Sequence, residues 1–162
     1  MEVNLIVAIG KDGAIGRAGD LIWKIPADLK RFKTLTTGHP VIMGRKTWDS
    51  LPKKPLPGRR NIIITRKKNF KADGAEIVNS VEEALETVKN DSPFIIGGAE
   101  IYKATLPLTT RLYLTRVEEE CGDADAFLDL NLNNDWEKIE ESPVESTQDG
   151  IRYRYLTYSR NA

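Results

Sequence analysis

Six short apolar segments constrain the fold of this chain more than any other feature of its sequence. They are rich in Ile and Val, mostly continuous rather than alternating, and lie at residues 4–9, 40–43, 61–65, 76–78, 94–96 and 111–117. Runs of this kind are typical of strands that are buried on both faces of a parallel sheet. Segments typical of helices lie between them, at residues 26–36, 46–50, 80–89 and 99–105. This alternation predicts an α/β protein with a twisted, mostly parallel central sheet flanked by four helices.

The C-terminal part departs from this pattern. Residues 136–142 and 151–159 alternate more regularly between apolar and polar side chains, and Asp149-Gly150 lies between them. Such a pattern predicts an antiparallel hairpin at the sheet edge, and hence a sheet of about eight strands whose C-terminal strand is antiparallel. The 162 residues contain no repeat, low-complexity tract or linker, so we expect one domain over residues 1–162.

Composition excludes several classes of function. Lys plus Arg and Asp plus Glu both number 24, which argues against nucleic-acid and membrane partners. One cysteine, Cys121, cannot form an internal disulfide and suits a reducing compartment. With a single histidine as well, we expect no metal site. The chain shows neither a basic leader nor an apolar run of ~18 residues, so we expect a cytoplasmic protein.

An acidic residue on an apolar helix face is the first candidate for chemistry. Pro26 suits a first helical position, and Asp28 then shares one face with Phe32 and Leu35. Asp28 is either a first-turn acid favoured by the helix dipole or a carboxylate in an apolar cleft with a raised pKa. In the second case it can hold a proton or accept paired hydrogen bonds from a flat heterocycle. Trp23 is either a core indole or a donor that fixes a water in that cleft.

Two strand-to-helix turns could hold phosphates. Gly97-Gly98 joins a buried strand to a helix, and Gly44 does the same ahead of Arg45, Lys46 and Thr47. The second turn does not have P-loop spacing, which disfavours a nucleoside triphosphatase. Arg45 and Arg66 follow neighbouring strands, and two such basic clusters suit a monophosphate such as the 2′-phosphate of NADPH. The glycine-punctuated segment 10–20 is either a plain surface loop or a mobile lid.

Taken in order, these motifs resemble dihydrofolate reductase from Leu5 to Tyr158. The motifs are Ile15-Gly16, Trp23-Lys24-Ile25-Pro26-Ala27-Asp28-Leu29, Val41-Ile42-Met43-Gly44-Arg45-Lys46-Thr47-Trp48, Pro55-Leu56-Pro57-Gly58-Arg59, Asn61-Ile62-Ile63-Ile64-Thr65-Arg66, Ile96-Gly97-Gly98-Ala99-Glu100-Ile101-Tyr102 and Leu112-Tyr113-Leu114-Thr115. The resemblance implies an NADPH-dependent enzyme that reduces 7,8-dihydrofolate to tetrahydrofolate by hydride transfer to C6 and protonation of N5. It also implies a monomer that binds antifolate inhibitors.

The resemblance also implies a role for individual residues. Asp28 would bind the pterin in the active site, with Thr115 hydrogen-bonded beside it and Trp23 fixing a water. Arg59 would bind the α-carboxylate of the glutamate tail. The residues that would line the folate cleft are Ile6, Val7, Leu21, Leu29, Phe32, Leu51, Leu56 and Ile96.

For the cofactor, the resemblance implies three contact regions. The adenosine half and its 2′-phosphate would meet Gly44, Arg45, Lys46, Thr47, Thr65 and Arg66. The pyrophosphate and nicotinamide end would meet Gly97, Gly98, Ala99, Glu100, Ile101 and Tyr102, with a cis peptide between the two glycines. The nicotinamide would be covered by Ala8, Ala14, Ile15, Gly16, Gly19 and Asp20.

Two sequence features and two other functions leave alternatives open. Leu21-Ile22 stands where the family usually has a proline before the tryptophan, which bears on lid stiffness. Asp125 aligns only loosely with the family's acid in that region, so its lid-bracing role stays open. A pyrimidine reductase of riboflavin synthesis shares this fold, and a non-catalytic nucleotide-binding module is a second alternative. Asp28, Phe32 and Arg59 favour folate as the substrate.

Overall fold

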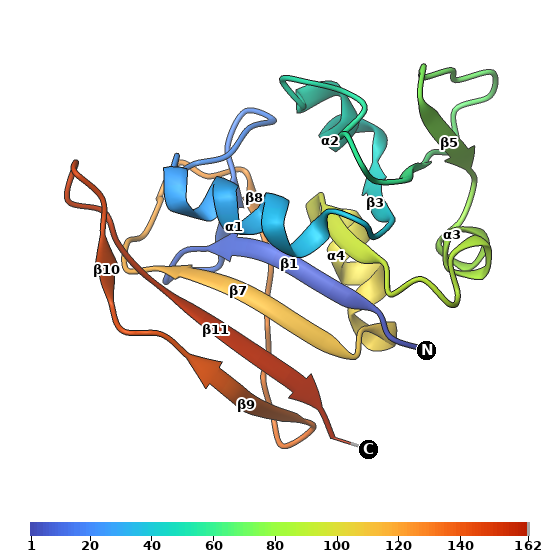
Figure 1. The fold of residues 1–162 in the computed structure, drawn as a ribbon. Coiled ribbons are helices and arrows are strands. Elements are labelled where there is room, and N and C mark those ends of the chain that lie inside the picture. Colours follow the sequence, from blue (N-terminus) through green and yellow to red (C-terminus); the bar gives the residue numbers. More distant parts are fainter. Residues whose placement is uncertain (162) are drawn as a thin grey trace.

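The six apolar segments form six neighbouring strands that all run parallel, as the sequence predicts. In this computed structural model, which describes residues 1–161, their order across the sheet is β7-β1-β6-β3-β4-β5. The strands are β1 (Asn4–Ile9), β3 (Val41–Gly44), β4 (Asn61–Ile64), β5 (Ala75–Val78), β6 (Phe94–Gly97) and β7 (Arg111–Val117). Figure 1 shows the N-terminal strand β1 near the middle of this sheet. Each strand is within about a residue of its expected bounds.

The C-terminal hairpin is more elaborate than expected. The long strand β11 (Arg152–Arg160) pairs antiparallel with β7 on one side and with both β9 (Trp136–Glu141) and β10 (Glu145–Ser146) on the other. The main sheet therefore has nine strands, one more than predicted. The Asp149-Gly150 turn connects β10 to β11, so the short, exposed β10 is the hairpin partner that the sequence pattern did not reveal.

The four predicted helices are present, as α1 (Pro26–Thr36), α2 (Arg45–Ser50), α3 (Val81–Thr87) and α4 (Ala99–Thr105). A 3-10 turn, η1 (Leu106–Leu108), extends α4. Ser80 caps α3, because its side chain accepts a hydrogen bond of 3.1 Å from the backbone N–H of Glu83. No helix among residues 1–161 is long and apolar enough to cross a membrane.

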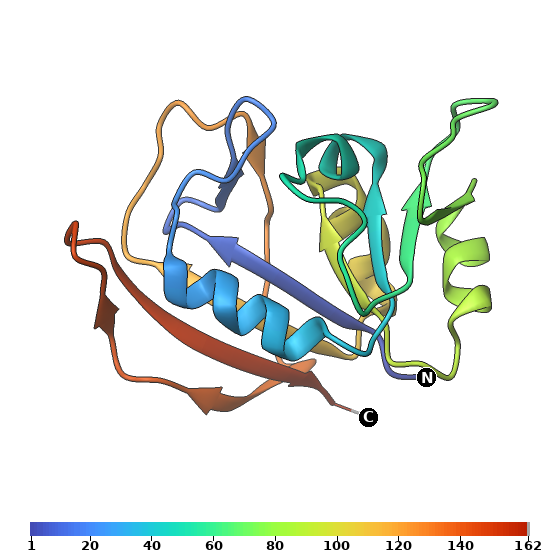
Figure 2. The same cartoon turned by 45° about the horizontal axis from the view of Figure 1, so that its top comes forward.

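The helices divide between the two faces of the sheet (Figures 1 and 2). Because side chains alternate along a strand, each face has its own apolar cluster. Helices α1 and α2 pack over the cluster that contains Ile6, Met43 and Ile63. Helices α3 and α4 pack over the cluster that contains Leu5 and Ile95. Both faces of the parallel strands are therefore buried, which explains why their apolar runs are continuous.

Segment 10–20 is not a plain loop. Its residues Ala14–Gly16 form β2, which pairs antiparallel with β8 (Ala126–Phe127) in a separate two-stranded sheet. The backbone N–H of Asp125 also donates to the carbonyl of Gly16, at 3.1 Å. The polar composition of the segment concealed this pairing, because the partner strand lies more than a hundred residues away.

Candidate active site

The first turn of α1 places Asp28 against β7. The Asp28 carboxylate is half-buried and accepts a hydrogen bond from the hydroxyl of Thr115, whose side chain is only 2 % exposed. Burial raises the pKa of Asp28, and it outweighs the opposing effects of the Thr115 hydroxyl and the Arg31 charge. Of the two interpretations of Asp28, the structure therefore favours a partly buried carboxylate with a raised pKa over a solvated first-turn acid.

The strand register gathers further residues around this carboxylate. Ala8 of β1 lies opposite Thr115 of β7, and Tyr155 of β11 lies opposite Thr115 on the other side. Trp23 is half-buried and packs with Ile25 in a small cluster at the start of α1. Its ring lies directly against Gly10: a Cβ at that position would approach Cη2 of the indole to 2.5 Å. The start of the predicted lid is thus packed on the Trp23 ring.

Most of the apolar side chains predicted to line the cleft share one face of the sheet. Five of them belong to the cluster under α1 and α2, namely Ile6, Phe32, Leu51, Leu56 and Ile96. Val7 differs, since alternation along β1 directs its side chain into the cluster on the opposite face and leaves only its backbone for the cleft. Leu21 and Leu29 are 49 % and 54 % exposed. Their contact with folate remains a prediction, and their exposure is what we expect of apolar side chains at the rim of a binding site.

Arg59 lies at the other end of α1 from Asp28. Its Nη1 donates to the hydroxyl of Thr36 at 2.9 Å, and its Nε donates to the carbonyl of Pro57 at 2.9 Å. Partial burial lowers the pKa of this guanidinium. Thr36 is the eighth residue after Asp28 on this helix, which places it about 12 Å further along the axis. A ligand that contacts both groups must therefore be elongated, with an anionic end at Arg59.

The two glycine turns face one another. Gly97-Gly98 has a cis peptide bond, as the resemblance implied, and ends β6 directly before α4. A Cβ at either glycine would come within 3.5 Å of the Thr47 hydroxyl in α2, and a Cβ at Gly44 would approach Ile101 of α4 to 3.1 Å. The absence of side chains thus lets the starts of α2 and α4 meet. Tyr102 is buried, and its hydroxyl donates to the carbonyl of Ile6 at 2.8 Å. Its side chain also packs beside Gly97 and so supports the glycine turn.

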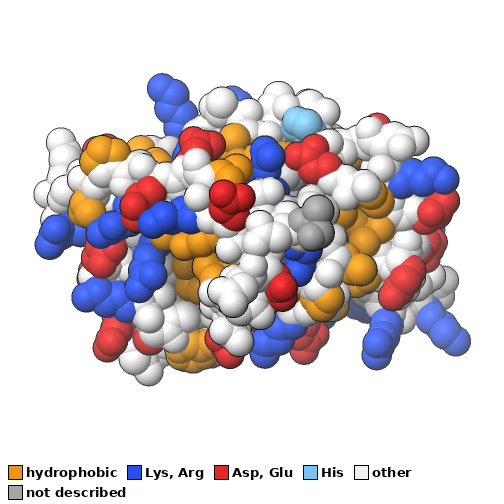
Figure 3. All heavy atoms as spheres, turned by 90° about the horizontal axis from the view of Figure 1, so that it is seen from below, with side chains coloured by type: hydrophobic (Ala, Val, Ile, Leu, Met, Phe, Trp, Pro, Cys, Tyr) orange, Lys and Arg blue, Asp and Glu red, His pale blue; other side chains and the backbone are white. Residues whose placement is uncertain are grey.

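The basic residues predicted to bind a phosphate also come together. Strands β3 and β4 pair in register, with Gly44 opposite Ile64, so that Arg45 and Arg66 follow adjacent strand ends. Arg45 forms an ion pair of 3.1 Å with Asp49, and Arg66 is exposed. Elsewhere, cationic and anionic side chains are interspersed over the face seen in Figure 3.

Acidic side chains anchor segment 10–20, the predicted lid. A carboxylate oxygen of Asp125 accepts a hydrogen bond of 2.9 Å from the backbone N–H of Ala18, and Asp123 forms an ion pair of 3.1 Å with Arg17. The Cys121 backbone N–H donates to Asp12 at 3.1 Å. The hydrogen bond from Ala18 ties Asp125 to the predicted lid segment, which is the contact that a lid-bracing role requires. No local sequence pattern indicates the contacts of Asp12, Arg17 and Asp123, because each partner is distant in sequence.

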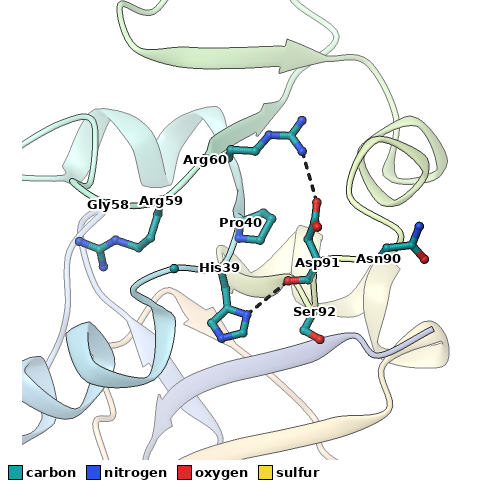
Figure 4. A pocket seen from close by; sticks show the side chains of 9 residues that line it. His39, Pro40, Gly58, Arg59, Arg60, Asn90, Asp91 and Ser92 are labelled. Atoms are coloured by element: carbon teal, nitrogen blue, oxygen red, sulfur yellow. Dashed lines mark hydrogen bonds and ion pairs between the residues drawn. The ribbon is translucent and has the colours of Figure 1, made fainter.

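A hollow in the surface has Arg59 in its lining but includes neither Asp28 nor the glycine turn (Figure 4). It has a volume of about 700 Å³ and is lined by residues that precede β3, β4 and β6, at the amino-terminal edge of the sheet. Its polar groups are largely engaged: Arg60 binds Glu76 and Asp91, and His39 contacts the Asp91 carbonyl. Among residues 1–161, no three acidic, His or Cys side chains group as metal ligands would.

The fold defines a class of protein: an α/β protein with a single, mostly parallel sheet, whose glycine turn and Asp28 follow the carboxyl ends of neighbouring strands. Comparison with known proteins then identifies the family. The family model for dihydrofolate reductase matches residues 2–160. The chain is 44 % identical to the dihydrofolate reductase of Mycobacterium leprae, over 98 % of both chains, and 41 % identical to that of Neisseria meningitidis, over 99 % of both.

A solved structure agrees with these sequence matches. Dihydrofolate reductase from Enterococcus faecalis, complexed with NADP(H) and RAB-propyl, superimposes with a TM-score of 0.90 and 31 % identity. The superposition covers 99 % of this chain and 97 % of that one. The chain belongs to the dihydrofolate reductase family, whose members are enzymes that act on dihydrofolate.

Proposed function

We propose that this chain reduces 7,8-dihydrofolate to tetrahydrofolate with NADPH as the hydride donor. One observation carries the proposal: a half-buried carboxylate, Asp28, is hydrogen-bonded to Thr115 at the start of α1, and a guanidinium, Arg59, is hydrogen-bonded to Thr36 at the end of the same helix. A pterin joined through an aromatic linker to a glutamate has matching ends, with an amidine-like edge for the carboxylate and an anion for the guanidinium. The names of the relatives support the same substrate.

The described residues fit the cofactor that this reaction needs. The close approach of the Gly97-Gly98 turn to Thr47 leaves backbone without side chains at two helix starts, where an anionic group is favoured. Arg45, Lys46 and Arg66 would bind the 2′-phosphate, with Thr65 beside them, and the segment from Ala14 to Asp20 would cover the nicotinamide. When bound, NADPH supplies the hydride that C6 of the pterin accepts.

The protein's own contribution is to orient the pterin and to control its protonation. The ionised Asp28 accepts hydrogen bonds from the amidine-like edge, and the Thr115 hydroxyl fixes the orientation of the carboxylate. Because the pKa of Asp28 is raised, the carboxyl group can also hold a proton closer to neutral pH and favour protonation at N5, which a water fixed by Trp23 delivers.

The apolar cluster under α1 and α2 contributes by excluding bulk water. Phe32 and Leu56 belong to this cluster, on the same face as Asp28. A cleft with such walls keeps competing water from the reacting rings and holds them in contact. The Ala14–Gly16 strand, which pairs with β8, would cover the nicotinamide beside these rings.

The test is a spectrophotometric assay of NADPH oxidation with the purified protein, with and without dihydrofolate. We expect absorbance loss only when both are present, and inhibition by an antifolate. Arg59→Met should raise the KM for dihydrofolate while leaving kcat within a few fold, since it removes a ground-state contact remote from the rings. Lys53→Met, an exposed change nearby, is the matched control. Binding of NADPH without turnover on dihydrofolate, or turnover only on a pyrimidine of riboflavin synthesis, would refute the proposal.

A further inference from the structure

A second polar cleft lies beside Tyr155. It has a volume of about 370 Å³ and is lined by Arg31, Glu140, Glu141, Ser142, Tyr155 and Thr157. Two buried polar atoms in its wall have no hydrogen-bond partner: Nη1 of Arg31 and the hydroxyl oxygen of Thr157, a residue that is 1 % exposed. Buried polar atoms without a partner are uncommon in folded proteins, so the hydrogen-bonding capacity of this wall is not used up by the side chains around it.

Arg31 is held in this cleft by aromatic rings rather than by acids. Its guanidinium carbon lies 4.1 Å from the centroid of the Tyr155 ring and 6.0 Å from that of Tyr113. It forms no ion pair within residues 1–161, although Glu140 and Glu141 line the same cleft. Glu141 is instead paired with Lys138 and Arg154. The charge of Arg31 is therefore not neutralised by direct contact.

The helix and the strand register bring this charge close to Asp28. Arg31 is three residues after Asp28 on α1, and residues with that spacing are neighbours on a helix surface. Tyr155, on which Arg31 stacks, lies opposite Thr115, the hydrogen-bond donor to Asp28. Tyr155 thus forms one wall of the polar cleft and is also the strand neighbour of the residue that binds the carboxylate.

We propose that Arg31 is a positioning residue that uses its unneutralised charge to keep Asp28 ionised. This inference rests on the proposed role of Asp28. The groups that face Asp28 from other elements are Thr115 of β7, Tyr155 of β11 and Tyr102 of α4, and all three are neutral at physiological pH. Burial raises the pKa of Tyr155 to about 12 and that of Tyr102 still further. Arg31 is the full charge that lowers the pKa of Asp28, against the larger effect of burial.

The test is a direct titration of Asp28 by carbon NMR of the aspartate carboxyl groups, with the Asp28→Asn variant used to assign the signal. We expect Arg31→Met, which keeps the length of the stem, to move the Asp28 midpoint to higher pH. The lower limb of the pH profile of kcat should move in the same direction. Arg31→Lys keeps the charge and should leave the midpoint close to that of the native protein. Lys30→Met removes one charge from the exposed side of α1 and should not move it.

Several outcomes would overturn this inference. They are an unchanged midpoint in Arg31→Met, an equal shift in Arg31→Lys, or an equal shift in Lys30→Met. Should Arg31→Met not fold, Arg31→Gln provides a second neutral variant. The titration does not depend on activity, so it also separates the two proposals. Full turnover by Asp28→Asn would refute the role of Asp28 in the reaction. An unchanged Asp28 midpoint in Arg31→Met would refute only the role of Arg31.

Discussion

Replacing Asp28 with Asn should make the protein more stable and much less active. The amide has nearly the same shape as the carboxylate, and its oxygen can still accept the Thr115 hydroxyl. It cannot ionise, however, so it avoids the desolvation that raises the pKa of Asp28 in the native protein. The hydrogen bond becomes weaker with a neutral acceptor. Because burial is the largest influence on this carboxyl group, we expect the gain in stability to exceed that loss.

The sign of the pH dependence follows from linkage. A folded-state pKa above the unfolded value means that the ionised carboxylate disfavours the fold at every pH above the folded pKa, and ceases to do so below the unfolded value. Each unit of difference corresponds to about 1.4 kcal/mol, reduced here because water partly screens a half-buried group. For a chain of this size, 1 kcal/mol corresponds to roughly 2–4 °C in Tm.

Thermal unfolding tests the predicted gain in stability, and turnover of the same preparations tests the predicted loss of activity. Asp28→Asn should have a higher Tm than the native protein at pH 8, with a difference that shrinks as the pH falls. Its kcat at neutral pH should be lower by about 10²–10⁴-fold, the range of general acid–base catalysis. Asp73→Asn, an exposed acid with no part in the cleft, should change neither. A lower Tm than that of the native protein at pH 8 would show that burying the Asp28 carboxylate does not destabilise the fold. Near-native turnover would show that Asp28 takes no part in the reaction.

Three further changes test other parts of the molecule. Arg45→Ala should narrow the preference for NADPH over NADH, and each tenfold loss of preference corresponds to about 1.4 kcal/mol of binding free energy. Asp49→Asn breaks the same ion pair and should leave the preference intact. Equal effects of the two substitutions would refute the 2′-phosphate site. Asp125→Ala removes the acceptor for the Ala18 N–H and should raise the KM for NADPH with little change in Tm, while Asp129→Ala, on the same segment, should not. Ser80→Ala should cost about 0.5–2 kcal/mol in chemical denaturation without affecting turnover, and an unchanged midpoint would remove Ser80 as a cap.

The parallel part of the fold could be predicted because its signals are local. Strands buried on both faces are continuously apolar, and Pro26 and Ser80 mark the starts of two helices. The pairings that depend on distant partners could not be predicted in this way. The short strands β2, β8 and β10 have two or three residues each, and each is defined only by the strand it pairs with.

The candidate site divides in the same way. The Asp28 face of α1 could be identified from helical spacing, but its hydrogen bond to Thr115 was implied by the resemblance alone. Val7 shows the limit of carrying a role over by position, because the alternation of β1 directs its side chain to the other face. Arg31 and Tyr155 carried no signal, since their contact depends on how α1 lies across β7 and β11.

The strand order gives an independent physical reason for the location of the cleft. From β1 the chain crosses one face of the sheet through α1 and enters β3, on the far side of β6. From β6 it crosses the opposite face through α4 and enters β7, on the far side of β1. Neighbouring strands whose connections leave in opposite directions form a crevice at their carboxyl ends, where α/β proteins bind ligands. Here these strands are β1 and β6, which end near Ala8 and Gly97. The crossover connections themselves therefore place the segment that leads to Asp28 and the glycine turn at the same edge of the sheet, before any side chain contributes.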